Sequence, residues 1–287
     1  MRPFDLLQPK TTDEAIALLA RHGSRACLLA GGTDLLVEIK EGIRAPDVLI
    51  DAKHLPGMRD LVVSSSEGLR FGALVTAREL ETSPAVKDFY HGLWQALREL
   101  GSIQVRNRAT VAGNVCRASP SADTLPPLIA DGAVVAIMGP AGERHVTLED
   151  FFTGAGKTVL NGDEIVTGFS VPKPLPGTGK CYVKHGRRKA MELATVGVAV
   201  TMTMTGDTCS SIRIALGAVA PTPIRARKAE AVLAGKKPDI ELIAQCGAIA
   251  ATETSPISNI RGSADYRRRM VEELVQRAIT AAMEAAR

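Results

Sequence analysis

Two stretches of the chain carry residue types and spacings that could do chemistry. The first is LLAGGTDLL at residues 28–36, where an apolar run enters two adjacent glycines, a threonine and an aspartate. The second is RNRATVAGNVCRASPSAD at residues 106–123, predicted to be a non-repeating loop of small and polar residues. Backbone N–H groups in tight turns form concave positive nests suited to a pyrophosphate, and glycine permits the close approach. Two such turns, one after each small α/β unit, predict an anion gripped from opposite sides.

The first turn must follow a strand of a small α/β unit. Thr11 and Glu14 form an S/T-x-x-E capping box that predicts a helix start, and Gly23 is a typical helix stop. Residues 26–30 and 46–51 are short apolar runs that we predict to be strands. A strand, a helix and further strands, with a glycine turn between them, predict an α/β unit of about 55 residues.

The second stretch lies among helix and strand patterns. Residues 69–73, 133–138 and 164–171 are strand-like, and one helix is predicted from Pro84 to Gly101. Aromatic and leucine residues recur along one stripe of that helix. We interpret the stripe as core packing rather than as a ligand site.

Beyond a proline- and glycine-rich linker at residues 173–180, the pattern changes. Residues 196–205 and 212–219 alternate with a period of two around a Gly-Asp turn, which predicts an antiparallel hairpin, and helical patterns finish the chain. The predicted fold class is α+β: a two-part α/β binding region followed by a C-terminal domain of antiparallel sheet with helices. The predicted domains are residues 1–55, 56–175 and 176–287.

Composition excludes several function classes. Of the 287 residues, 45% are hydrophobic and 3% aromatic, and the net charge is +4, which does not favour a nucleic-acid binder. No apolar run approaches the ~20 residues that span a bilayer, so we expect a cytoplasmic protein without a transmembrane segment. The five scattered cysteines fit reduced thiols and show no metal-ligand spacing, so no metal site is predicted.

Other catalytic motifs are absent from the sequence or incomplete. GAGKT at residues 154–158 ends like a phosphate-binding loop, but Phe151 stands where GxxxxGKT would need its first glycine, so we predict a turn. No GxGxxG follows a strand, and there is no GxSxG or HExxH. No catalytic residue is therefore predicted.

AGGTDLL, followed by RNRATVAGN and SPSAD, resembles the FAD-binding medium subunit of the molybdenum hydroxylases. That family includes the flavin chains of xanthine dehydrogenases and carbon monoxide dehydrogenase. The resemblance covers essentially the whole chain, from PFDLLQPKTTDEAIALL to IALGAVAPTPIRARKAE. Many relatives carry two glycines where this chain has Ala112-Gly113, so Gly113 is expected to carry the close approach.

The resemblance implies roles for individual residues. The first turn would cradle the FAD pyrophosphate, and the second stretch would complete the cradle. Asp123 matches a position that contacts the flavin. Val166 matches an aliphatic residue that covers the flavin ring, with a plain core strand residue as the alternative. Lys184 matches a cation near the carbonyl edge of the ring, with a solvated edge as the alternative. The implied FAD-binding residues are Leu28, Leu29, Ala30, Gly31, Gly32, Thr33, Asp34, Ala109, Thr110, Gly113, Asn114, Cys116, Asp123, Val166 and Lys184.

The resemblance also implies a function. The chain would carry FAD and pass electrons from two [2Fe-2S] clusters of a small partner subunit to an external acceptor. A large partner subunit would hold the molybdenum cofactor, and the complex would be a dimer of heterotrimers. The alternatives are a stand-alone flavin oxidase or reductase with its own substrate site, and a subunit in which FAD is only structural.

Overall fold

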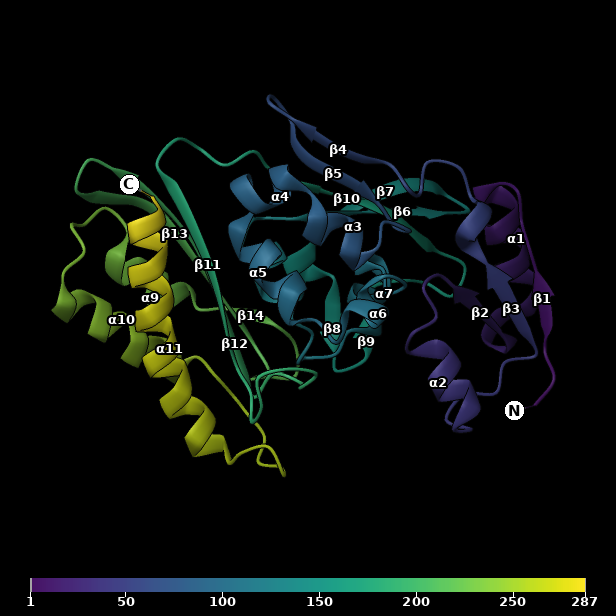
Figure 1. Ribbon diagram of the computed structural model, residues 1–287. Helices are drawn as coiled ribbons and strands as arrows, with labels where there is room; N and C mark the ends of the chain where they lie inside the picture. Colours follow the sequence, from purple (N-terminus) through teal and green to yellow (C-terminus); the bar gives the residue numbers. More distant parts are fainter. Residues whose placement is uncertain (1, 287) are drawn as a thin grey trace.

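The computed structural model describes residues 2–286, arranged as three larger sheets, a small two-stranded sheet and their helices along an elongated molecule (Figure 1). We call residues 2–55 the first region, residues 56–175 the second and residues 176–286 the third. In Figure 1 the first region lies at the right, the third at the left and the second between them. Sites formed by two regions therefore lie at two separate junctions.

The first region is a small parallel α/β unit, as the sequence predicts. Its sheet has the order β1-β3-β2, and both outer strands run parallel to β3. The helix α1 begins after Thr11, whose side chain accepts the Glu14 N–H, and it ends at Gly23, where φ is 54°. The elements are β1 Asp5–Leu7, α1 Thr12–His22, η1 Gly23–Arg25, β2 Ala26–Leu29, α2 Leu35–Lys40, β3 Val48–Asp51 and η2 Ala52–His54.

The second region has a five-stranded antiparallel sheet, β4-β5-β10-β6-β7, a two-stranded sheet, β8-β9, six short α-helices and one 3-10 helix. The single helix predicted over residues 84–101 is wrong, because the chain leaves the helical conformation at Tyr90. The buried Tyr90 hydroxyl there donates to the Pro172 carbonyl at 3.2 Å. The elements are β4 Leu61–Ser64, β5 Gly68–Gly72, α3 Ala77–Thr82, α4 Pro84–Phe89, α5 His91–Glu99, α6 Ile103–Arg106, α7 Val111–Arg117, α8 Leu125–Ala130, β6 Val134–Gly139, β7 Gly142–Thr147, η3 Leu148–Asp150, β8 Phe152–Gly154, β9 Lys157–Thr158 and β10 Ile165–Val171.

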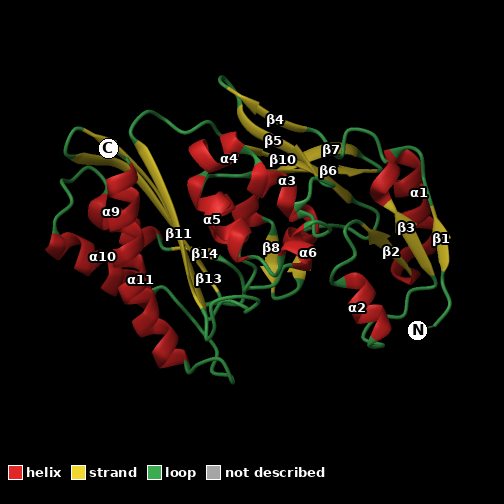
Figure 2. Cartoon of the chain, in the orientation of Figure 1, coloured by secondary structure: helices red, strands yellow, loops and turns green. Residues whose placement is uncertain are grey.

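The third region is a four-stranded antiparallel sheet, β11-β12-β13-β14, that contains the predicted hairpin. The predicted linker over residues 173–180 is too long, because Thr178 already pairs with β12 and Lys180 is buried. Figure 2 shows α10 and α11 on one side of this sheet and α5 on the other. The elements are β11 Thr178–His185, β12 Val196–Thr205, β13 Thr208–Gly217, β14 Ile224–Arg225, α9 Arg227–Leu233, α10 Ile240–Thr252 and α11 Ala264–Ala285.

The sheet of the third region serves two cores, because successive side chains of a strand point to opposite faces. On β12, Val198 and Val200 pack into the cluster that also contains α10 and α11, whereas Ala199 belongs to the main core shared by the first and second regions. On β11, Tyr182 likewise faces the main core and Cys181 faces the helices. The even-numbered side chains of β11 are therefore the ones turned toward the second region.

Two negative predictions can be examined in the structure. The GAGKT stretch forms the tight turn between β8 and β9, which confirms the prediction of a turn there. No helix within residues 2–286 has both the length and the apolar character needed to cross a bilayer.

Candidate functional site

The first glycine turn is set by the backbone around it. The strand β2 ends at Leu29, and Gly32 then adopts φ 76°, a left-handed conformation that favours glycine. A Cβ atom on Gly31 would overlap the carbonyl oxygen of Arg108, which belongs to the second region. Glycine at position 31 is therefore required by direct contact between the two candidate segments, before any ligand is considered.

The second segment differs from the predicted non-repeating loop, because residues 111–117 form the helix α7. Thr110 is its N-cap, and its Oγ1 accepts the Gly113 N–H at 3.0 Å. A threonine followed by small residues starts this short helix, and the first-turn N–H groups of a helix have no carbonyl partner within it. Ala112 takes an ordinary helical conformation and is buried in the main core, while Gly113 is exposed. Of these two residues, Gly113 is therefore the one that a ligand could approach, and its contact with FAD stays a prediction.

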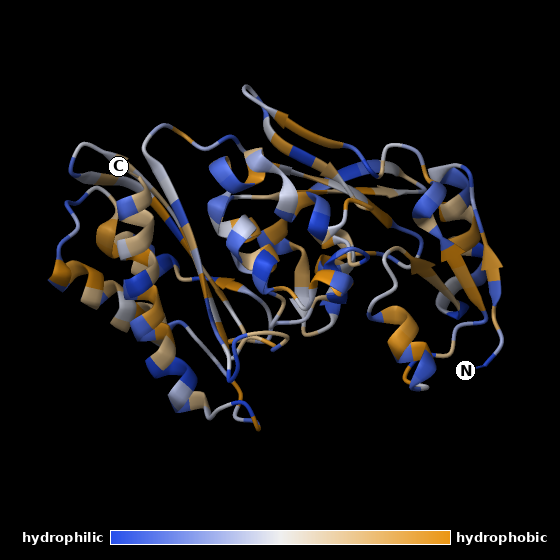
Figure 3. Ribbon diagram, in the orientation of Figure 1, coloured by the Kyte–Doolittle hydropathy of each residue, from blue (hydrophilic) through white to orange (hydrophobic). Residues whose placement is uncertain are grey.

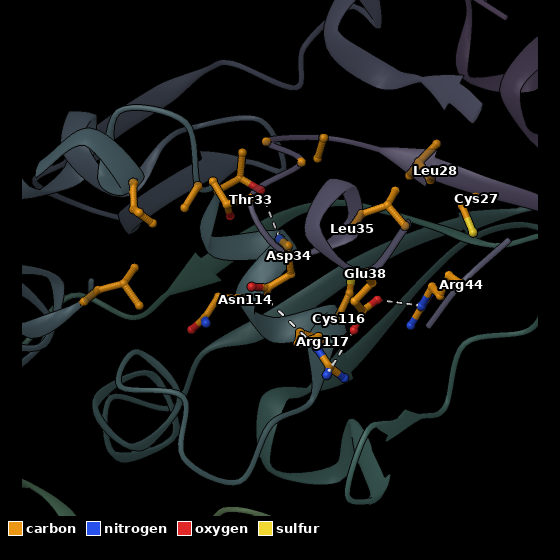
Figure 4. Close-up of a pocket in the computed structure, with 18 of the residues that line it drawn as sticks. Cys27, Leu28, Thr33, Asp34, Leu35, Glu38, Arg44, Asn114, Cys116 and Arg117 are labelled. Carbon is orange, nitrogen blue, oxygen red and sulfur yellow. Dashed lines mark hydrogen bonds and ion pairs between the residues drawn. The ribbon is translucent and has the colours of Figure 1, made fainter. Parts of the chain in front are cut away.

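A cavity of about 380 Å³ lies between the two segments (Figure 4). Most of the predicted FAD-binding residues line it: Leu28, Ala30, Gly31, Gly32, Thr33, Asp34, Ala109, Thr110, Gly113, Asn114 and Cys116. The prediction missed a further set of lining residues: Ala26, Cys27, Leu35, Glu38, Arg44, Leu100, Val105 and Arg117. Several of these come from α2 and the residues that follow it.

Leu29, Asp123 and Val166 are predicted site residues that line neither this cavity nor a second one that Lys184 lines. Leu29 packs beneath the glycine turn with Ile39 and Leu49 in a small cluster of its own. Val166 lies on β10 opposite Ile137 and is part of the main core. Val166 is thus a buried strand residue, and its contact with the flavin ring stays a prediction.

Charged groups gather on one wall of the cavity. The Glu38 carboxylate forms two ion pairs. One oxygen lies 2.7 Å from Arg44 Nε, and the other lies 3.1 Å from a guanidinium nitrogen of Arg117. Arg117 Nε also lies 4.0 Å from an Asp34 carboxylate oxygen (Figure 4). Two acidic and two basic side chains therefore leave this wall with no formal net charge.

Asp123 and Lys184 meet at the second junction, between the second and third regions. Lys184 Nζ donates to the Asp123 carboxylate at 2.8 Å and to the Glu99 carbonyl at 3.1 Å, and its side chain is only 6% exposed. The Tyr182 hydroxyl donates to the other Asp123 oxygen at 2.8 Å. The alternative of Lys184 as a solvated edge residue is therefore wrong, since its ammonium group is buried in an ion pair.

Burial sets the protonation chemistry of this cluster. Removal from water raises the pKa of Asp123 to about 6, although Lys184 and the Tyr182 hydroxyl act in the opposite direction. Burial, followed by the neighbouring Asp123 charge, holds the pKa of Tyr182 well above its usual value. Asp123 therefore keeps its proton to a higher pH than an exposed aspartate does.

Short links join the two junctions. Glu99 and Lys184 line a second cavity of about 500 Å³, and the adjacent Leu100 lines the first. In addition, the Thr124 hydroxyl donates to Asn114 Oδ1 at 2.7 Å, which ties the residue after Asp123 to the wall of the first cavity. The Asp123–Lys184 pair and the wall of the first cavity are therefore joined through neighbouring residues of the second region.

Comparison with known proteins matches nearly the whole chain. Residues 2–174 match the family model described as the FAD binding domain in molybdopterin dehydrogenase, and residues 181–282 match the CO dehydrogenase flavoprotein C-terminal domain. The carbon monoxide dehydrogenase medium chain of Hydrogenophaga pseudoflava is 37% identical, over 97% of this chain and 96% of that one. The putative xanthine dehydrogenase FAD-binding subunit XdhB of Escherichia coli (strain K12) is 31% identical, over 96% of this chain and 94% of the relative.

Solved structures agree with these matches. The structure of carbon monoxide dehydrogenase from Hydrogenophaga pseudoflava is similar with a TM-score of 0.95, at 38% identity over 99% of both chains. Quinoline 2-oxidoreductase from Pseudomonas putida 86 gives 0.92, at 30% identity over 99% of this chain and 98% of that one. The fold and the paired glycine segments thus define an FAD-binding flavoprotein, which confirms the predicted fold class. The chain belongs to the family of FAD-binding medium subunits of molybdenum-dependent dehydrogenases.

Proposed function

We propose that this chain is the FAD-carrying electron-transfer subunit of a molybdenum hydroxylase, taking electrons from [2Fe-2S] clusters of a small partner and delivering them to an external acceptor. The observation that supports this best is the cavity between the two glycine segments, which lies within the matched FAD-binding domain. The relatives are named as medium chains and FAD-binding subunits, which favours a role beside other chains.

The residues of the cavity fit a bound dinucleotide. Gly32 and Gly113 keep side-chain bulk away from the cavity wall, and the Thr33 hydroxyl belongs to the same wall. The turn at residues 30–34 and the first turn of α7 would hold the pyrophosphate. Bound FAD would supply the conversion between single-electron and paired-electron transfer.

At the second junction, the chain would contribute charge rather than acid–base catalysis. Lys184 and Asp123 are held in fixed positions by Tyr182 and the Glu99 carbonyl, so their charges are preorganised near the second cavity. A buried ammonium group there would favour negative charge on a bound ring system. This role agrees with the prediction that the chain itself supplies no catalytic residue.

The proposal also covers the partner subunits, the stoichiometry of the complex and its location. A large partner would hold the molybdenum cofactor and a small partner the two [2Fe-2S] clusters, in a dimer of heterotrimers located in the cytoplasm. Within this chain, we retain residues 1–55 and 56–175 as the two FAD-binding domains and residues 176–287 as the C-terminal domain.

Native purification tests the proposal. The material should release FAD upon denaturation, and mass spectrometry should find a molybdenum-cofactor chain and an iron–sulfur chain with it. Anaerobic addition of the substrate of the complex should bleach the flavin absorbance. Release of no flavin nucleotide would refute the proposal, and a lone chain that turns over a small substrate would support the stand-alone alternative instead.

A further inference from the structure

The helix α2 is loosely attached to the rest of the first region. Of its six residues, only Ile39 is buried, and it packs in the small cluster with Leu29 and Leu49 rather than in the main core. Leu36 and Val37 on the same helix are 40% and 49% exposed. Figure 3 shows α2 largely in the apolar colour at the edge of the molecule. Local packing therefore gives α2 little resistance to displacement.

Movement of α2 would move the first glycine turn with it. The Leu36 N–H donates to the Gly32 carbonyl at 3.0 Å, and the Glu38 N–H donates to the Asp34 carbonyl at 2.9 Å. Leu35 and Glu38 also line the cavity directly. The position of α2 consequently sets the shape of the wall that carries residues 32–34.

Arg117 connects this wall to the opposite one. It is the last residue of α7, whose N-cap is Thr110 and whose first turn contains Gly113, both on the far side of the cavity. Among residues 2–286, both ion pairs that join the first region to the second are made by Arg117, with Glu38 at 3.1 Å and with Asp34 at 4.0 Å (Figure 4). The Glu38 side chain is 12% exposed and the Arg117 side chain 42%, so solvent screens only the arginine side of this pair strongly.

Glu38 is held in place for this contact. Its backbone carbonyl accepts the Ile43 N–H at 2.8 Å, and its second carboxylate oxygen contacts Arg44 Nε at 2.7 Å. The turn after α2 thus orients the carboxylate before Arg117 reaches it. Glu38 thus pairs with Arg44 of its own region and with Arg117 from across the cavity, and its carboxylate joins the two walls.

We propose that the Glu38–Arg117 pair is a latch that fixes α2 as the outer wall of the FAD cavity, and that Glu38 and Arg117 are positioning residues that set how long bound FAD is retained. This inference rests on the proposed function, since it takes FAD as the ligand of the cavity. It adds a kinetic role for two residues that the resemblance did not assign.

An opposite role for Arg117, direct contact with a phosphate, makes a different prediction. If Arg117 held the ligand, neutralising Glu38 would free the guanidinium for the phosphate and slow FAD release. If the pair is a latch, Glu38→Gln and Arg117→Gln both loosen α2 and both speed release. The sign of the effect of Glu38→Gln therefore separates the two roles.

The experiment measures FAD release from the full-length chain purified with its flavin. The chain is diluted, and the fluorescence increase of free FAD gives the release rate. Glu38→Gln and Arg117→Gln should each speed release about five- to tenfold, and the double variant should be no faster than either single one. Raising the salt concentration should speed release from the wild type more than from Arg117→Gln.

Asp47→Asn is the matched control. It also turns a carboxylate into an amide in the first region, but its partner Arg25 belongs to the same region and neither residue lines the cavity. It should release FAD at the wild-type rate. Unchanged or slower release from Glu38→Gln, or additive effects in the double variant, would overturn the latch. A wild-type chain without FAD would refute the proposed function itself, which is a separate result.

Discussion

Gly113→Ala should change the stability of the FAD-free chain and its affinity for FAD in opposite directions. Apart from the backbone of its own helix, Thr110 Oγ1 at 3.1 Å is the one atom of the described residues within 4 Å of a Cβ placed at position 113. Replacing a helical glycine with alanine stabilises a helix by about 0.8–1 kcal/mol, and this tight contact offsets part of the gain. Without FAD, the free energy of unfolding should therefore change by between about 0 and +1 kcal/mol.

The effect of Gly113→Ala on FAD binding should have the opposite sign. The new methyl group would hold a pyrophosphate away from the first-turn N–H groups of α7, and each hydrogen bond to a charged group contributes about 1.5–3 kcal/mol. Loss of one such bond weakens FAD binding about 10- to 100-fold. Urea unfolding of the FAD-free chain and fluorescence titration with FAD measure the two quantities on the same protein.

Gly92→Ala provides the helical control for this experiment. Gly92 is in the first turn of α5, and its new Cβ would meet the Cys181 backbone at an ordinary 3.4 Å, away from the first cavity. It should leave the FAD affinity unchanged. If Gly113→Ala binds FAD as tightly as the wild type, then the pyrophosphate does not approach α7, and the assignment of the second segment is wrong.

Three further predictions follow from close contacts and buried charges. Gly31→Ala should lower the free energy of unfolding of the FAD-free chain by about 1–3 kcal/mol in urea, because its Cβ overlaps the Arg108 carbonyl oxygen; Gly162→Ala, with open space around its Cβ, should not. Burial raises the pKa of Asp123 from its usual 3.8 to about 6, so the native chain binds more protons between these values and its stability falls as the pH rises through them. Relative to Asp123→Asn, the wild type should therefore lose up to about 3 kcal/mol from pH 4 to pH 7 in urea titrations, and a flat difference would contradict the raised pKa. Lys180→Met leaves the buried Asp131 carboxylate without its partner at 2.7 Å and should lower the free energy of unfolding by about 3–5 kcal/mol, with partial recovery when Asp131→Asn is added.

The first half of the site could be predicted from sequence because its determinants are local. The apolar strand, the two glycines and the threonine lie within residues 28–36, and the capping residue Thr11 marks the start of the preceding helix. Turn chemistry of this kind depends on neighbours in the chain rather than on the tertiary structure. The strand, turn and hairpin positions of the fold were predicted for the same reason.

The second half was misjudged because short helices leave little periodic signal. The seven residues of α7 cover only two turns, and alanine, glycine and asparagine give no apolar stripe. Thr110 as a capping residue was the one local sign of a helix start.

Ion pairs between residues far apart in the sequence could not be predicted from local sequence patterns. Glu38 meets Arg117, and Lys184 meets Asp123 across 61 residues, so the partners become visible only when the regions are packed. The buried state of Lys184 had the same origin, since a basic cluster such as KHGRRK reads as solvated in isolation. The walls of the first cavity contributed by α2 and Arg44 were missed for this reason as well.

The alternation of side chains along β11 limits the insertions that this strand can accept. Lys180, Tyr182 and Lys184 occupy every second position and meet Asp131 and Asp123, whereas Cys181 faces the helices α10 and α11. One residue inserted after Tyr182 would bring Val183 opposite Asp123 and turn the ammonium group toward the opposite face. Insertions should therefore accumulate in the loops before Thr178 and after His185, while the length of this strand stays constant.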